Sequence, residues 1–165
     1  METGIAALND NPKKILVVDD DKDLNLTICE ELQFEGYEVI SALDGKHAIE
    51  MARELLPDFI LMDVMMPELD GIDTCKFLKK DTSTSAIPMI IMSAKNDMQT
   101  KLSSFYNGAK RYLSKPFLLE DLLDEIRKVL EQRELSRKIS DYHDRCNGKG
   151  DFGVFTPDFK CADSK

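Results

Sequence analysis

Short hydrophobic runs and helical patterns alternate along the first 130 residues of the chain. Three of the runs have the length of a strand and end in a polar side chain, and two shorter runs accompany them. The predicted strands cover residues 14–19, 37–41, 58–63, 88–93 and 111–113. The longer runs are continuously apolar, which is typical of strands buried on both faces of a parallel sheet.

Helical periodicity fills the intervals between these runs. Leu24, Ile28 and Leu32 repeat at spacings of four, which predicts one buried face of a helix. Similar patterns cover residues 48–55, 72–78, 98–106 and 118–130, and the last one continues into 131–144. Strands that alternate with helices imply right-handed crossovers and a parallel sheet covered on both faces. The sequence therefore predicts a doubly wound α/β domain.

Polar side chains stand where the predicted strands end. Residues 19–21 are three consecutive aspartates after the first strand, Asp63 ends the third, Ser93 ends the fourth, and Lys115 follows the fifth. In a doubly wound sheet these ends gather at one edge, where functional groups lie. Carboxylates brought close together repel one another, and a hard dication such as Mg²⁺ removes that cost. A carboxylate can also attack phosphorus when nearby cations neutralise the transferring oxygens.

Four segments carry a resemblance to a known family. They are ILVVDDD (15–21), FILMDVMMPELDG (59–71), IIMSAKND (90–97) and YLSKPF (112–117). Together, in this order and at this spacing, they resemble the CheY-like receiver domain of two-component response regulators. The resemblance covers about residues 13–130. It implies a flavodoxin-like five-stranded sheet in the order 2-1-3-4-5, with helices on both faces.

The resemblance also implies the chemistry of the site. Asp63 is expected to accept the phosphoryl group. Mg²⁺ is expected to bind Asp20, Asp63 and the main-chain carbonyl of Met65, with Asp19 acting through a metal-bound water. An apolar Met65 cannot hold an attacking water, so the sequence predicts slow self-hydrolysis of the phosphoprotein.

Three further residues receive roles from the resemblance. Lys115 is expected to pair with the acceptor carboxylate or its phosphate, and Ser93 to hydrogen-bond a phosphoryl oxygen. Tyr112 occupies the position of the aromatic switch, so phosphorylation is expected to draw Ser93 inward and let Tyr112 turn behind it. A cis peptide between Lys115 and Pro116 is expected to aim the lysine at the pocket. An aromatic side chain at position 112 could equally well just pack on the neighbouring helix.

Composition narrows the function classes. The 165 residues include 31 acidic and 22 basic side chains, a formal charge of −9, and 42% hydrophobic residues. This balance predicts a globular protein that does not bind nucleic acid directly. No apolar run is long enough to span a bilayer, and the first residues do not resemble a secretory signal. We therefore expect a cytoplasmic protein without membrane insertion.

The expected organisation has three parts. Residues 1–12 are interpreted as an N-terminal tail, 13–130 as the receiver domain, and 131–165 as a helical extension followed by a flexible tail rich in glycine. The chain is interpreted either as a regulator that acts by protein contact or as a fragment of a longer regulator whose output domain is missing.

The expected function is a signalling switch. A histidine kinase or phosphotransfer protein would phosphorylate Asp63, and the face formed by the fourth helix, fifth strand and fifth helix would bind a downstream protein. A phosphorylation-dependent homodimer stays open. We expect kinase docking at exposed residues of the first helix, such as Asn25, and at the loop after the fifth strand.

Two other classes compete with this one. One is an unphosphorylated docking module of the pseudo-receiver type. The other is a phosphatase with an aspartate nucleophile, but such an enzyme needs a second carboxylate two residues after the nucleophile, where this chain has Met65. We therefore expect no enzyme in the ordinary sense, only a domain that catalyses its own phosphorylation and slow dephosphorylation.

Overall fold

The computed structural model describes residues 12–94 and 98–147 of the chain. The expected N-terminal tail up to residue 11 and the expected flexible tail from 148 lie outside the described residues. The chain divides into two compact units, Met1–Arg133 and Glu134–Lys165. The first unit holds the whole sheet and is described here together with the site.

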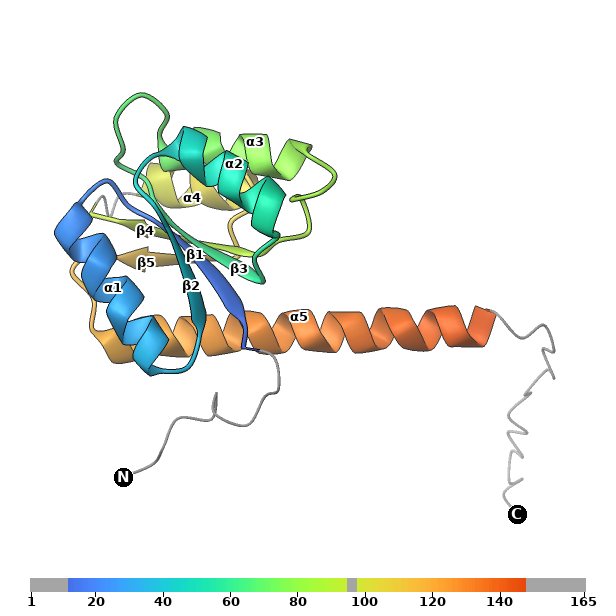
Figure 1. Cartoon of the computed structure of the whole chain (residues 1–165). Coiled ribbons are helices and arrows are strands. Elements are labelled where there is room, and N and C mark those ends of the chain that lie inside the picture. The colour runs from blue at the N-terminus through green and yellow to red at the C-terminus, as the bar shows by residue number, and fades with distance from the viewer. Residues whose placement is uncertain (1–11, 95–97, 148–165) are drawn as a thin grey trace, which may run out of the picture. The chain divides into compact units, whose positions relative to one another are not determined.

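Five parallel strands form one sheet in the order β2-β1-β3-β4-β5 (Figure 1). The strands are β1 (Lys14–Val18), β2 (Glu38–Ala42), β3 (Phe59–Asp63), β4 (Met89–Ser93) and β5 (Arg111–Ser114). Every residue of β3 and β4 is buried, as the continuous apolar runs predicted. The predicted fold class and strand order are confirmed. Each observed strand begins and ends within one residue of its predicted bounds.

Five helices connect and cover the strands. They are α1 (Lys22–Phe34), α2 (Gly45–Leu55), α3 (Gly71–Lys80), α4 (Met98–Tyr106) and α5 (Leu119–Asn147). Aspartate carboxylates cap the first three helices at Asp21, Asp44 and Asp70, where they accept hydrogen bonds from exposed main-chain N–H groups. The predicted helices are confirmed, including the continuation of the fifth beyond residue 131.

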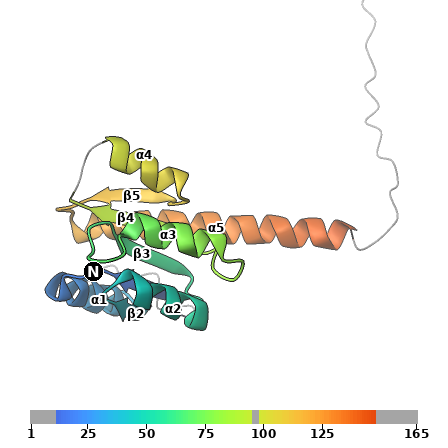
Figure 2. The same ribbon diagram turned by 90° about the horizontal axis from the view of Figure 1, so that it is seen from above.

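The core has two parts, one on each face of the sheet. Helices α1 and α5 cover one face, and α2 and α3 cover the other (Figures 1 and 2). Side chains of β1 alternate between them, so that Ile15 and Val17 face α1 and α5 while Leu16 and Val18 face the other side. Both faces are therefore closed, and the carboxyl edge of the sheet is where polar groups can gather.

The last part of the first unit is held by an ion pair. The guanidinium of Arg133 contacts the carboxylate of Asp58 at 3.6 Å and also donates a hydrogen bond to the main-chain carbonyl of Asp58, just before β3. In the second unit, the described side chains from residue 134 to residue 142 are all exposed. None of the described helices combines the length and the hydropathy that crossing a membrane requires.

Candidate functional site

The polar residues predicted at the strand ends lie at the carboxyl edge of the sheet. Asp19 follows β1, Asp63 is the last residue of β3, and Ser93 is the last residue of β4. The exposed fractions of these residues are 1%, 3% and 0%. Asp20 is exposed, so the site contains both enclosed carboxylates and one at its mouth. Such burial of ionised groups requires nearby countercharge.

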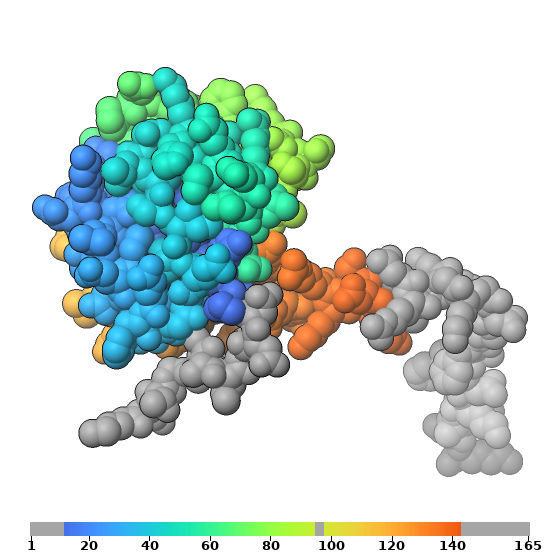
Figure 3. Space-filling view, in the orientation of Figure 1, coloured from blue at the N-terminus to red at the C-terminus, as the bar shows by residue number. Residues whose placement is uncertain are grey.

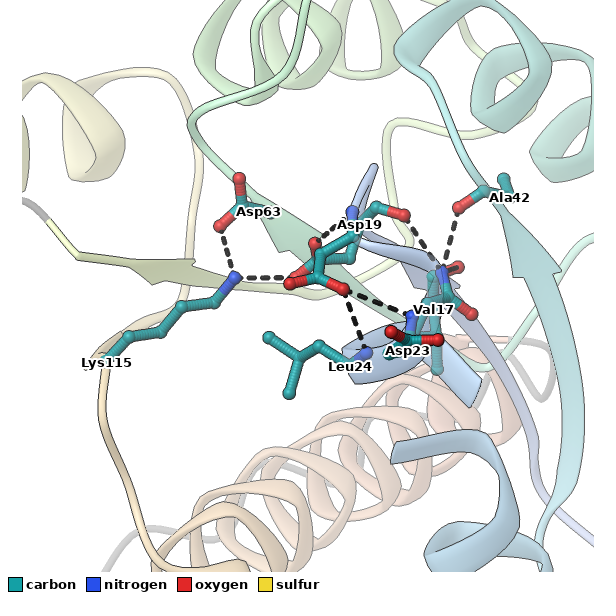
Figure 4. A network of polar contacts seen from close by, with 9 residues as sticks. Val17, Asp19, Asp23, Leu24, Ala42, Asp63 and Lys115 are labelled. Carbon is teal, nitrogen blue, oxygen red and sulfur yellow. Dashed lines mark hydrogen bonds and ion pairs between the residues drawn. The ribbon is translucent and has the colours of Figure 1, made fainter. Parts of the chain in front are cut away.

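Lys115 supplies that countercharge. Its Nζ lies 2.6 Å from Oδ2 of Asp19 and 2.7 Å from Oδ1 of Asp63, so one ammonium group joins two strands of the sheet (Figure 4). The main-chain N–H of Lys115 donates to the carbonyl of Ser93 at 2.8 Å, which ties the loop after β5 to the end of β4. The expected cis peptide between Lys115 and Pro116 is present.

Two pKa values in the site are shifted, and each shift has a structural cause. Burial raises the pKa of Asp19 above its ordinary value, even though hydrogen bonds from Lys115 and from the main chain of Asp21 oppose the shift. Burial alone would lower the pKa of Lys115, but hydrogen bonds and charges of Asp19 and Asp63 outweigh it and raise that pKa. Both pKa values are thus raised, that of Asp19 by burial and that of Lys115 by its two anionic partners. Counted as charges, the three carboxylates of Asp19, Asp20 and Asp63 outnumber the single ammonium group of Lys115.

Three carboxylates are close enough to hold one ion. One oxygen each of Asp19, Asp20 and Asp63 can be chosen so that all three lie within 4.8 Å of one another. Oxygen ligands of this kind suit Mg²⁺, which binds through one or two carboxylates and keeps several waters. The excess of negative charge gives such an ion a reason to bind, so the residues fit the cofactor that the resemblance implies.

The loop between β1 and α1 is held at both ends. The main-chain N–H of Asp21 donates to Oδ1 of Asp19 at 3.0 Å, while the carboxylate of Asp21 accepts from the N–H groups of Asp23 and Leu24. Asp21 thus caps the N-terminus of α1. Asn25, however, is 2% exposed and buried against the strand ends, so its expected place on an exposed docking surface is wrong.

A glycine lies directly behind Asp63. The N–H of Gly71, at the start of α3, donates to the carbonyl of Val64 at 3.0 Å, and the N–H of Val64 donates to the carbonyl of Met92 at 3.1 Å. A Cβ atom on Gly71 would lie 1.9 Å from the carbonyl oxygen of Asp63. Only glycine therefore allows α3 to begin this close to the end of β3.

The remaining predicted residues lie around this centre. Tyr112 is partly buried on β5 and packs against the hydrophobic cluster on the α2 and α3 side of the sheet. The ammonium of Lys101, on α4, lies 5.5 Å from the centre of the Tyr112 ring. Met65 lies two residues after Asp63 in an exposed loop, with 53% of its surface accessible. Tyr112 thus links α4 to the sheet, while Met65 lies at the mouth of the site.

Comparison with known proteins decides the family. Residues 15–127 match the family model described as the response regulator receiver domain. The chain belongs to this family. The receiver domain is 36% identical over 121 residues to the DNA-binding dual master transcriptional regulator RpaA of Synechocystis sp., a match that covers 73% of this chain and 50% of that protein. The response regulator MprA of Mycobacterium ulcerans is 38% identical over 122 residues, 74% of this chain and 52% of MprA.

A solved structure agrees with both matches. The chemotaxis protein CheY4 of Vibrio cholerae superimposes with a TM-score of 0.70 at 30% identity, covering 72% of this chain and 99% of that chain. The chain spans about half the length of the curated relatives that it matches. The match therefore covers about half of each relative, and what the rest of those relatives does is not part of the match.

Two residues that shape the site were missed by sequence reasoning. Asn25 lies three residues before Ile28 and four before Cys29, both buried, so helical spacing places it on the buried face of α1. Its polar character suggested the opposite. Gly71 was read only as part of a motif, and its close approach to Asp63 depends on how two elements meet.

Proposed function

We propose that this receiver domain is a phosphorylation-activated switch that accepts a phosphoryl group on Asp63 with the help of Mg²⁺. The observation that supports it best is the arrangement of Lys115 between Asp19 and Asp63, with Asp20 within reach of the same ion. A carboxylate held beside a cation in an acidic pocket is suited to attack phosphorus rather than to transfer protons.

In the proposed reaction an oxygen of Asp63 attacks the phosphorus atom of the donor, and the bond between phosphorus and the donor's leaving group breaks. Asp20, Asp63 and the main-chain carbonyl of Met65 would hold Mg²⁺, with Asp19 acting through a bound water. Bound Mg²⁺ supplies positive charge for the phosphoryl oxygens. Lys115 pairs with the acceptor carboxylate beforehand and would pair with the phosphate afterwards.

The proposed switch runs from the site to the outer surface of α4. Ser93 is buried beside the acceptor strand and would turn toward a phosphoryl oxygen, and Tyr112 would follow it. Since Lys101 lies over the Tyr112 ring, a rotation of that ring would alter how α4 meets β5. Four exposed side chains on α4 suit a downstream protein: Met98, Leu102, Phe105 and Tyr106.

The proposed partners follow from the family. A histidine kinase or phosphotransfer protein would donate the phosphoryl group, and the output would be a contact of the α4, β5 and α5 face with another protein, in the cytoplasm. Two alternatives stay open: a docking module that is never phosphorylated, and the receiver part of a longer regulator. RpaA is by its name a DNA-binding regulator, and only its receiver half is matched here.

The test is labelling with a small phosphodonor. The full chain is incubated with acetyl phosphate and Mg²⁺, and the addition of one phosphoryl group is followed by intact mass. Asp63→Asn should abolish labelling. Asp58→Asn is the matched control, because Asp58 precedes the other end of the same strand and should leave labelling intact. Equal labelling of all three proteins, or none with any small or protein donor, would favour the docking module.

A further inference from the structure

A buried amide lies next to the acidic site without belonging to it. Asn25, on the first turns of α1, directs its side-chain nitrogen at three main-chain carbonyls where β1 and β2 end. The distances from Nδ2 are 3.0 Å to the oxygen of Ala42, 3.2 Å to that of Asp19 and 3.5 Å to that of Val17. Carbonyl oxygens only accept hydrogen bonds, so the NH₂ group must be on this side.

The other end of the amide is equally well defined. Its Oδ1 accepts from the hydroxyl of Ser41 at 2.7 Å and from the thiol of Cys29 at 3.3 Å. Both of those groups can donate, so the orientation of the amide follows from the chemistry of its neighbours. Asn25 is therefore fixed from both ends, with donors and acceptors matched.

We infer that Asn25 is a positioning residue for the proposed Mg²⁺ site, acting through the main chain that carries Asp19 and Asp20. The carbonyl of Asp19 belongs to the peptide unit that joins these two aspartates. A hydrogen bond to this oxygen fixes the plane of that peptide, and with it the directions in which both carboxylates leave the chain. This inference rests on the proposed function and identifies a residue outside the ligand set.

The neighbouring bonds support the same role. The carbonyl of Ala42 accepts both from the Asn25 amide and from the main-chain N–H of Asp19, at 3.2 Å, so β1 and β2 are joined at the point where the site begins. The main-chain N–H of Asn25 donates to the carbonyl of Asp21 at 2.8 Å. The three aspartates are thus attached to the first turn of α1 at both ends of their loop.

The surroundings of Asn25 determine which substitutions are informative. Asn25 also lines a surface pocket of about 380 Å³ between α1 and β2, on the face seen in Figure 3. Water could enter from this pocket and replace the lost amide in Asn25→Ala. Leucine has the same branching and number of side-chain heavy atoms as asparagine, its methyl groups are bulkier, and it has no hydrogen-bonding group, so Asn25→Leu excludes water and removes the hydrogen bonds of the amide. The two variants together separate loss of volume from loss of hydrogen bonds.

The experiment is a calorimetric titration of the full-length protein with Mg²⁺ alone. Because residues behind a metal site typically change metal affinity by about 10- to 100-fold, and Asn25 acts through the main chain, we expect Kd to rise about tenfold in Asn25→Leu. In Asn25→Ala the Kd for Mg²⁺ should also rise, but by less. At saturating Mg²⁺, labelling by acetyl phosphate should return to within a few fold of wild type.

Leu32→Ala is the matched control. Leu32 is fully buried two turns further along α1, so its truncation destabilises the same helix without touching the carboxylates. Its Kd for Mg²⁺ should stay within twofold of wild type. Unchanged affinity in Asn25→Leu, or an equal loss in Leu32→Ala, would overturn the positioning role and leave the proposed function standing. Failure of the wild-type protein to bind Mg²⁺ would instead refute the metal site itself.

Discussion

Replacing Gly71 by alanine tests how closely α3 is packed on the end of β3. The added Cβ would lie 1.9 Å from the carbonyl oxygen of Asp63, 2.8 Å from its carbonyl carbon and 3.0 Å from Cγ of Met62. The first two atoms are main chain of a central strand that is bonded on both sides. They cannot turn away as a side chain could, so either α3 or the end of β3 must move.

Two opposing effects determine how much Gly71→Ala lowers the free energy of unfolding. Overpacking a well-filled interior costs about 1–3 kcal/mol, and the rigid obstacle here argues for about 3 kcal/mol. Alanine in place of glycine within a helix stabilises by about 0.5–1 kcal/mol. The difference is a loss of about 2 kcal/mol in the free energy of unfolding, which for a chain of this size lowers Tm by about 4 to 8 °C.

The assay is thermal and urea unfolding followed by circular dichroism, with Gly45→Ala as the comparison. Gly45 holds the same position in α2, directly after an aspartate cap, but the nearest atom to its Cβ is the side-chain oxygen of Thr74, at 2.3 Å. A side chain yields more readily than a strand, so Gly45→Ala should lose less stability. The reasoning is refuted if Gly71→Ala is as stable as wild type or less affected than Gly45→Ala.

Three further results are expected. Lys115→Ala leaves two buried carboxylates without their cation, so the free energy of unfolding measured in urea should fall by about 3 kcal/mol, and Mg²⁺ should restore part of it. A decrease below about 1 kcal/mol would contradict the pairing. Because the pKa of Asp19 is raised in the folded protein, the protein loses stability as the pH rises above the ordinary value of 3.8 and Asp19 ionises. Mg²⁺ binds the ionised carboxylate, so it should raise Tm more at pH 7 than at pH 4. An equal increase in Tm at the two pH values would contradict this. Burial raises the pKa of Cys75 to about 12, so at pH 8 its thiolate population is lower by about 10³-fold than that of a free thiol. Peptide mapping should find Cys75 unmodified by iodoacetamide until urea unfolds the protein, and rapid native labelling would refute its burial.

The fold was predictable because its signals are local. Continuous apolar runs predicted strands buried on both faces. The polar residue at the end of each longer run marked the edge of the sheet where a site could form. Asp63, Ser93 and Lys115 were found in this way, since the end of a strand is visible in the sequence even when its neighbours in space are not.

The parts that were missed depend on contacts between distant segments. Asn25 was assigned to the surface because polar residues usually lie there. Its burial is tolerated only because carbonyls at the ends of two strands and a hydroxyl on β2 happen to surround it. Gly71 likewise appeared in the sequence only as the last residue of a motif. Its constraint comes from the carbonyl of Asp63, which no local pattern reveals.

The order in which the site is synthesised follows from the separation of its charges along the chain. All three carboxylates of the cluster precede residue 64, whereas the lysine that joins Asp19 lies 96 residues after it. At about 5–20 residues per second, roughly 3 to 10 s pass between the synthesis of Asp63 and that of Lys115. During this interval a nascent chain carries the anionic half of the site without its cation. The last strand to be made therefore does more than complete the sheet, because the lysine that follows it offsets part of the repulsion between the carboxylates made earlier.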